Sequence, residues 1–544
     1  MRTLACLIGL FCLALGAYAQ NATTTIAKGY VFHDANENRI KEDTERGIPE
    51  VAVSNGVDIV RTDANGAYEL PVAQGDAVIF IVKPRDWMTP LNEENLPQFY
   101  YLHKPNGYPD NYTYPGVEPT GKLPDEINFP LYPEQSAESY KVVIFGDPQP
   151  YNIEMIDFLS EDIISELIGK HQLKFGMTMG DIVGDNLDFF RPMNQAVAQL
   201  GIPWYNVLGN HDVNYMAPTD ELSDETFERV YGPATYAFVY GDVHFIVLDD
   251  VIHESKAGSR SYVGGLRPDQ LDFVANYLEL APKNDLIVLT MHIPLAQHGE
   301  SFRQSDQKKL FDLLKEFPHT LSISAHTHVH NNVFFHQDST DWQQAQPHHH
   351  FNVGTTSGSW WNGMRNEVDV PHTIMRDGTP NGYSFITFNG NDYVIDWKVA
   401  GSPEDHQMNI HLPRGIKANE RDTVLLTVNF FNGSEQAKLE YRIKGMSEWR
   451  EMTKVAKYDP FYLKIDERWD RLEEINLPET WVGTFGETVT RPGTSMPAPS
   501  VSTHLWEANI GSDFPAGRHI VEVRATDRYG RVFTDYASLR VVNE

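Results

Sequence analysis

The sequence predicts a mixed α/β fold, in which a central α/β domain lies between two β-sandwich domains. Three observations predict it: strand-like runs near both ends, alternating strand-like and helix-like stretches in the middle, and middle segments rich in Asp, Asn and His. The length of 544 residues supports the division, because one hydrophobic core does not grow to that size. A hydrophobic fraction of 41% indicates folded domains rather than a disordered chain.

The first 19 residues are predicted to be a secretory signal peptide. Arg2 provides a basic start, an apolar run extends from Leu4 to Leu15, and Ala17-Tyr18-Ala19 has small residues where cleavage is expected. The run is shorter than the ~20 residues that a membrane-spanning helix needs. No later segment is long and apolar enough to span a membrane.

Cysteine content and charge indicate the compartment and limit the partners. Both cysteines, Cys6 and Cys12, lie in the signal peptide. An exported chain of this size without disulfides indicates the bacterial periplasm or cell surface rather than the eukaryotic secretory route. The net charge of −31 repels nucleic-acid backbones and anionic membranes, so neither is expected as a partner.

Residues 25–133 are predicted to form the N-terminal β-sandwich. Short strand-like runs alternate with turn clusters, and Asp63-Ala64-Asn65-Gly66 is typical of a hairpin turn. The segment containing Asp34, Asn36, Asn38 and Glu45 resembles the calcium loop of bacterial surface B-type repeats, and its oxygen spacing suits calcium. Arg39 stands where glycine is usual, so an acidic solvated loop is the alternative.

Residues 139–400 are predicted to form the central α/β domain, and residues 405–544 the C-terminal β-sandwich. In the central part, apolar residues recur at helical spacing over Ile153–Ile168. In the C-terminal part, strand-like runs return, and Tyr529-Gly530 predicts a hairpin turn.

Five short polar segments in the central domain carry the functional signal. Three follow apolar runs that predict buried strands: Val142–Phe145, Leu286–Leu289 and Leu321–Ile323. Side chains at the carboxyl ends of neighbouring strands converge on one crevice in an α/β sheet. The five segments are Gly146-Asp147-Pro148-Gln149, Gly180-Asp181-Ile182-Val183-Gly184-Asp185, Gly209-Asn210-His211-Asp212, Met291-His292-Ile293 and Ala325-His326-Thr327-His328. Together they offer enough oxygen and nitrogen ligands for two adjacent metal ions.

The identity and order of these segments resemble the calcineurin-like metallophosphoesterases, over the whole central domain. The flanking β-domains are similar to the extensions of secreted bacterial members. The resemblance implies a central four-layer domain, a β-sandwich flanked by helices, that holds two transition-metal ions (Mn, Fe or Zn).

The resemblance also assigns roles to individual residues. Asp181 matches the carboxylate that bridges the two ions. Asp147, Gln149 and His328 would complete the first site, and Asn210, His292 and His326 the second. His211 matches a histidine that contacts phosphate and protonates the leaving oxygen, and Asp212 would orient its imidazole. Asp185 is expected to support the ligand loop.

Two positions depart from the commonest family pattern. Gln149 stands where histidine is usual, and its amide oxygen is a weaker donor than imidazole. Ala325 replaces the glycine before His-x-His, and a methyl group is tolerated there if φ is negative.

Two further segments have no settled role. Trp360-Trp361, between glycines, could line the substrate cleft or belong to the core. The run His348-His349-His350 is consistent with a metal-sequestering surface tract or with a segment that supports ligands or faces substrate.

The sequence therefore predicts an exported metal-dependent phosphoric ester hydrolase, in which metal-activated water attacks phosphorus. We expect phosphomonoesters in slight preference to diesters, as small molecules or as glycan- or lipid-linked phosphate esters. A diesterase of the same mechanism is the close alternative. A non-enzymatic cell-surface binding module is the alternative from another class. The sequence does not specify the oligomeric state.

Overall fold

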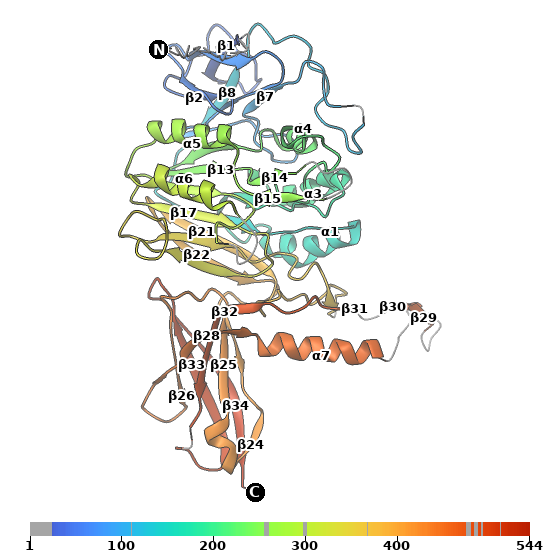
Figure 1. The fold of residues 1–544 in the computed structure, drawn as a ribbon, viewed down its shortest axis with the longest axis vertical. Coiled ribbons are helices and arrows are strands. Elements are labelled where there is room, and N and C mark those ends of the chain that lie inside the picture. The colour runs from blue at the N-terminus through green and yellow to red at the C-terminus, as the bar shows by residue number, and fades with distance from the viewer. Residues whose placement is uncertain are drawn as a thin grey trace, which may run out of the picture.

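The computed structural model describes residues 24–543, apart from 110, 255–259, 297–301, 367, 475–479, 483–487, 491–492 and 512. The predicted signal peptide lies outside the described residues. Three parts are stacked along the long axis, with the chain termini at opposite ends (Figure 1). No helix in the described part of the chain is long and apolar enough to cross a membrane.

The N-terminal part contains two four-stranded sheets, with strand orders β4-β1-β8-β6 and β3-β2-β5-β7. Its core includes Val31, Leu70 and Phe80, all fully buried. The strands are β1 (Thr24–His33), β2 (Ala52–Ser54), β3 (Ile59–Arg61), β4 (Ala67–Ala73), β5 (Ala77–Ile81), β6 (Trp87–Met88), β7 (Tyr100–His103) and β8 (Phe129–Pro133). The turn at Asp63–Gly66 joins β3 to β4, which lie in different sheets, so the expected hairpin is wrong.

The central part is built on two sheets packed face to face. The five-stranded sheet has the order β11-β10-β9-β21-β22, and the six-stranded sheet the order β12-β13-β16-β17-β19-β18. The first contains β9 (Ser139–Phe145), β10 (Leu173–Thr178), β11 (Trp204–Asn206), β21 (Gly382–Asn389) and β22 (Asp392–Val399). The second contains β12 (Tyr236–Tyr240), β13 (Val243–Val247), β16 (Leu286–Thr290), β17 (Thr320–Ser324), β18 (Asn331–Phe335) and β19 (His348–Asn352).

Helices cover the outer faces of both sheets, which confirms the predicted four-layer α/β fold. Alternation along β9 sends Ile144 into the core between the sheets and Val143 toward the helices on the other side. Those helices are α1 (Ile153–Leu159), the π-helix η1 (Ser160–Ile164), α2 (Ser165–Leu167) and α3 (Phe190–Val197). The six-stranded sheet is covered by α5 (Pro268–Leu280) and α6 (Gln304–Leu314), where Phe311 packs on Phe335 with ring centroids 5.1 Å apart.

Strand direction places the functional loops at one edge. Strands β9, β10 and β11 run parallel, as do β13, β16, β17 and β19. The helix α4 (Glu225–Tyr231) and the short pair β14 (Val251–His253) and β15 (Tyr262–Gly264) lie in the loops beyond this edge. All five polar segments of the sequence therefore leave carboxyl ends of parallel strands and can meet.

The C-terminal part contains a four-stranded sheet, β23-β25-β32-β28, and a five-stranded sheet, β24-β34-β33-β26-β27. Thr526 pairs with Val532 across the turn at Tyr529-Gly530, which confirms that hairpin. The strands are β23 (Met408–His411), β24 (Gly415–Lys417), β25 (Leu425–Phe430), β26 (Lys438–Ile443), β27 (Arg450–Glu451), β28 (Thr453–Tyr458), β32 (Val501–Asn509), β33 (Gly517–Thr526) and β34 (Val532–Val542). The helix α7 (Pro460–Glu474) extends sideways beneath the central part (Figure 1), near the short strands β20 (Gly363–Met364), β29 (Thr480–Val482), β30 (Thr488–Thr490) and β31 (Gly493–Thr494).

The histidine run lies inside the molecule, which corrects the expectation of a surface tract. His348, His349 and His350 form most of β19, whose neighbours are β17 and β18, and each is at most 2% exposed. The Ser322 hydroxyl lies 2.8 Å from His348 Nε2 and 2.7 Å from His350 Nδ1. A strand covered on both faces must be buried throughout, so these imidazoles are satisfied by side-chain partners instead of water.

Candidate metal centre and active site

The seven predicted metal ligands lie at the carboxyl-end edge of both central sheets. All are buried except His326, which is partly exposed. Asp147 and Gln149 follow β9, Asp181 follows β10, Asn210 follows β11, His292 follows β16, and His326 and His328 follow β17.

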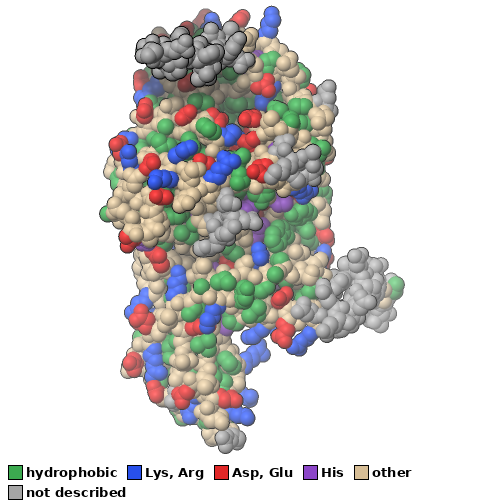
Figure 2. Space-filling model, in the orientation of Figure 1, with side chains coloured by type: hydrophobic (Ala, Val, Ile, Leu, Met, Phe, Trp, Pro, Cys, Tyr) green, Lys and Arg blue, Asp and Glu red, His purple; other side chains and the backbone are tan. Residues whose placement is uncertain are grey.

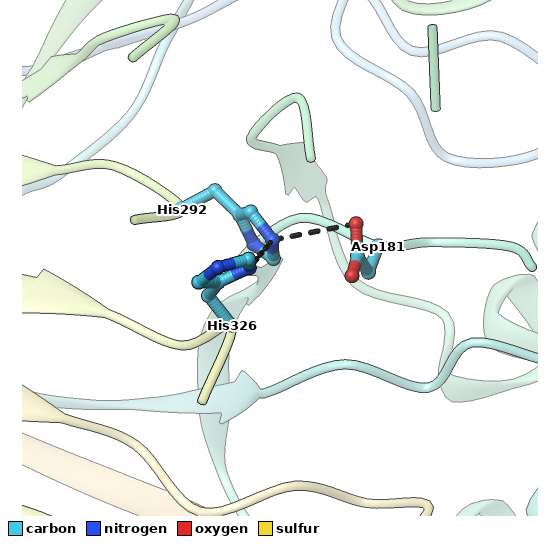
Figure 3. A group of neighbouring side chains, drawn as sticks. All are labelled: Asp181, His292 and His326. Atoms are coloured by element: carbon cyan, nitrogen blue, oxygen red, sulfur yellow. Dashed lines mark hydrogen bonds and ion pairs between the residues drawn. The ribbon is translucent and has the colours of Figure 1, made fainter. Parts of the chain in front are cut away.

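Four of these residues meet around His292. Its Nε2 lies 3.0 Å from Asn210 Oδ1, 3.1 Å from His326 Nδ1 and 3.3 Å from Asp181 Oδ1. Figure 3 shows both imidazoles directed toward each other and toward the Asp181 carboxylate. Ligand atoms of Asp181, His292 and His326 lie within 4.8 Å of one another, a spacing that suits a shared metal ion.

The remaining three residues meet around His328. Its Nε2 lies 2.9 Å from Gln149 Oε1 and 4.0 Å from Asp147 Oδ1. Asp147 Oδ1 is also 4.0 Å from His292 Nδ1, which connects the two groups.

Backbone carbonyls fix which imidazole nitrogen faces the site. Nδ1 of His292 lies 2.8 Å from the Met179 carbonyl oxygen, and Nδ1 of His328 lies 3.0 Å from the Gly358 oxygen. A carbonyl only accepts, so each Nδ1 carries the proton and donates it. This is the arrangement that prepares a histidine for metal binding through Nε2.

Several ligand residues adopt the left-handed backbone region, which non-glycine residues rarely enter. The φ angles are 33° at Asp147, 40° at Gln149, 48° at Asp181, 68° at His326 and 52° at His328. Strained backbone of this kind clusters at functional sites and persists only where the surroundings enforce it.

Models of one protein family match the chain over three successive stretches. The N terminal of calcineurin-like phosphoesterase matches residues 34–116, calcineurin-like phosphoesterase residues 140–330, and the C terminal of calcineurin-like phosphoesterase residues 350–533. The chain belongs to the calcineurin-like phosphoesterase family. It is therefore a metal-dependent phosphoric ester hydrolase, and the binding-module alternative is set aside.

Individual proteins are much less similar to this chain than the family models are. None of the curated protein sequences matches this calcineurin-like phosphoesterase. Solved structures with some similarity include a purple acid phosphatase, PPD1, from yellow lupin (Lupinus luteus) seeds. It is 12% identical, with a TM-score of 0.34 and coverage of 64% of this chain and 67% of that one. The structure of PhoD is 10% identical, with a TM-score of 0.35 and coverage of 82% and 98%.

The donor set of this phosphoesterase fits bound cations. With Nδ1 protonated, His328 Nε2 directs a lone pair at Gln149 Oε1 only 2.9 Å away. Two acceptors at that distance repel unless a cation lies between them, or unless the Gln149 amide is rotated so that its NH2 group faces the imidazole. Imidazole, carboxylate and amide donors together suit Mn, Fe or Zn.

The charges of the ligands also favour a cation. Burial lowers the pKa of the imidazoles, to about 3 for His326 and about 4 for His328, so their lone pairs are free. Burial acts on His292 too, but the carboxylates of Asp181 and Asp147 raise its pKa to about 10. Burial raises the pKa of Asp147 to about 8. A proton on His292 thus supplies the positive charge that the carboxylates need, and metal binding would release it.

His211 is oriented by Asp185, which corrects the expected role of Asp212. His211 Nδ1 lies 2.7 Å from Asp185 Oδ1, while its Nε2 is 4.0 Å from Asp181 Oδ2. Burial lowers the pKa of His211, but Asp181 and Asp185 outweigh it and the pKa lies above its ordinary value. The raised pKa favours the imidazolium form, in which Nε2–H points toward the metal ligands and can donate its proton.

Asp212 instead fastens the ligand loops. Its carboxylate accepts N–H bonds from Ile182 at 3.1 Å, Val183 at 3.2 Å and Gly209 at 2.9 Å. It thereby joins the segment after β10 to the segment after β11. Burial raises the pKa of Asp212 to about 7, and the three amides oppose that shift.

The two tryptophans have different environments. Trp360 is partly exposed and stacks on the His328 ring, with centroids 4.1 Å apart, beside a pocket. Trp361 is 2% exposed, and its Nε1 donates to the Pro148 carbonyl at 3.1 Å. The structure therefore places Trp360 at the cleft, whereas Trp361 supports the Asp147–Gln149 loop from the core.

The proposed calcium ligands hold their own loop. Asp34 accepts N–H bonds from Asn38 and Arg39, at 3.2 and 2.8 Å, and Asn38 Oδ1 accepts from Ile40. Asn36 Oδ1 accepts from Asn38, and Glu45 Oε1 accepts from Ala35 at 2.9 Å. Backbone N–H groups of the loop thus donate to side-chain oxygens of all four residues.

Sequence reasoning missed Asp250, which positions a ligand. Its two oxygens accept the N–H groups of His292 at 3.0 Å and Ile293 at 2.8 Å. It is fully buried just beyond the end of β13. That place, after an apolar run at the same sheet edge, is the signal that could have found it.

Proposed function

We propose that this protein is an exported phosphoesterase that holds two transition-metal ions and hydrolyses phosphate esters with water. The convergence of seven buried or partly buried donors in two connected groups carries this proposal. The group of Asp147, Gln149 and His328 would hold one ion, and the group of Asn210, His292 and His326 the other. Asp181 would serve both.

Bound transition-metal ions would supply a nucleophile from water at neutral pH and offset charge on a phosphoryl group. The residues of the chain have separate tasks. Asp250 and Asp212 fix the loops that carry the ligands, and the carbonyls of Met179 and Gly358 orient two imidazoles. His211, held by Asp185, would give its Nε2 proton to the leaving oxygen.

The proposal includes the export of the protein and the kind of ester that it hydrolyses. The predicted signal peptide over residues 1–19 and the lack of cysteines after it support export to the periplasm or cell surface. Acidic and basic side chains are interspersed on the face in Figure 2, with no extended basic patch there. Together with the net charge, this favours a small-molecule, glycan-linked or lipid-linked ester over a nucleic acid.

Metal-resolved hydrolysis tests the proposal. Metal-free protein would be reloaded with Mn, Zn, Fe or Co and assayed on p-nitrophenyl phosphate and bis-p-nitrophenyl phosphate, with bound metal counted for each sample. We expect turnover only with about two transition-metal ions per chain. Full activity with one ion, or with none, would contradict the two-metal mechanism.

A further inference from the structure

A pocket of about 440 Å³ opens beside the imidazoles of His326 and His328. Trp360 forms part of its wall, and so do Ser500 and Val501, at the start of β32 in the C-terminal part. The pocket is therefore lined both by two of the predicted metal ligands and by residues of the C-terminal part.

Arg376 lines this pocket and is fixed in place by its backbone and side chain. Its Nε donates to the Ala498 carbonyl at 2.9 Å, and its own carbonyl accepts from Ser500 at 2.8 Å. The adjacent Asp377 carboxylate accepts from the His330 N–H at 2.7 Å and lies 3.1 Å from His504 Nε2.

Most N–H donors of the Arg376 guanidinium are available to a ligand. In the described part of the chain, no carboxylate lies within 4.0 Å of it, and its one hydrogen bond uses Nε. In a chain of net charge −31, a half-buried arginine without a carboxylate partner is well suited to an anion.

A second pocket, of about 270 Å³, borders the site on the side of His211. It is lined by Asp185, the partner of His211, together with Tyr114, Tyr215 and Arg260. The two pockets share no lining residue. In the proposed mechanism the leaving group lies on the His211 side, so the first pocket is left for a substituent that stays on phosphorus.

We infer that the substrate is a phosphodiester whose retained alcohol carries an anionic group, bound by Arg376. This inference rests on the proposed function and replaces the expected preference for monoesters, which have no retained alcohol. In the reaction, one water oxygen forms a new bond to phosphorus and the bond to the leaving oxygen breaks. That oxygen takes a proton, and the retained alcohol remains as a phosphomonoester.

A matched pair of substrates tests this assignment. They are 4-nitrophenyl phenyl phosphate and 4-nitrophenyl 4-carboxyphenyl phosphate, both of which release 4-nitrophenolate. We expect the wild type to have the higher kcat/KM on the carboxylate substrate. Arg376→Ala should lose about tenfold or more on that substrate and change little on the other. Arg376→Lys, which keeps the charge but not the planar fork, should be intermediate.

Binding of a product provides a second readout that does not depend on turnover. Calorimetry with 4-carboxyphenyl phosphate and phenyl phosphate should show tighter binding of the first to metal-loaded wild type, and equal binding to Arg376→Ala. Arg518→Ala removes the same charge from an exposed position on β33 and should behave as wild type.

Two results would overturn the assignment. One is an equal kcat/KM for the two diesters in the wild type. The other is an equal loss on both diesters in Arg376→Ala, which would indicate a structural role. Failure to hydrolyse any ester with two metals bound would instead contradict the proposed function, and the binding comparison would still decide the role of Arg376.

Discussion

Asp185 Oδ1 lies 2.7 Å from His211 Nδ1, and Arg260 contacts the other oxygen of the same carboxylate. A carboxylate only accepts, so Nδ1 carries a proton directed at Asp185. Nε2 carries a second proton, facing the metal ligands, in the imidazolium form that the carboxylates of Asp181 and Asp185 favour by raising the pKa of His211. Asp185 is thus the positioning residue of the proposed acid, although it is 26 positions away in sequence.

Asp185→Asn should lower kcat by about tenfold to a hundredfold and leave metal content unchanged. Asp185 contributes to the raised pKa of His211, so its loss should lower that pKa. Because the acid acts only while protonated, activity is lost as pH rises through this pKa. The basic limb of the pH–rate profile should therefore move to lower pH. An unmoved limb would contradict this role.

Asp181→Asn and His211→Ala should separate metal binding from proton transfer. Asp181→Asn should lose bound metal and activity together, because the buried carboxylate that we propose serves both ions is replaced by a neutral amide. His211→Ala should retain metal and lose about a hundredfold or more on an alkyl phosphate, whose leaving oxygen needs a proton. Metal analysis beside single-substrate kinetics checks both. Full activity of His211→Ala on the alkyl ester would exclude the acid role.

The convergence of the seven candidate ligands was predictable from sequence, because each follows a strand and side chains at one sheet edge converge. The partner of His211 was not predictable, because adjacency in sequence does not show in which direction a side chain points. Asp212 follows His211 immediately, yet it faces the backbone of Ile182 and Val183. For the same reason, the sequence could not separate Trp360 at the pocket from Trp361 in the core. Arg376 had no motif in the sequence, and contacts with Ala498 and Ser500, more than 120 positions away, hold it beside the pocket.

Asp34→Ala should destabilise the N-terminal sandwich whether or not calcium is present. Its buried carboxylate accepts two backbone N–H groups, and leaving them unpaired costs about 1–3 kcal/mol. Unfolding midpoints measured with calcium and with a chelator should fall by the same amount. A loss confined to the calcium-containing sample would show instead that Asp34 binds the ion.

Protonation of the histidines of β19 should make the protein sensitive to mild acid. Burial lowers the pKa to about 3 for both His348 and His350, and burial also keeps the pKa of His349 well below its usual range. In the unfolded chain each takes a proton near pH 6.5. The stability they contribute is therefore complete above pH 6.5 and is lost as pH falls toward 3.

When the pH is lowered from 7.5 to 5.5, each of the three histidines should reduce the free energy of unfolding by about 1.4 kcal/mol, or by about 4 kcal/mol together. Urea unfolding of the central domain at both values measures this loss. His350→Gln keeps a side chain able to bond Ser322 and Ser324 but does not titrate, so its loss should be smaller by about 1.4 kcal/mol. His336→Gln is the matched control, because His336 is exposed and paired with Glu435. An identical pH response in His350→Gln and wild type would mean that β19 opens to solvent before the domain unfolds.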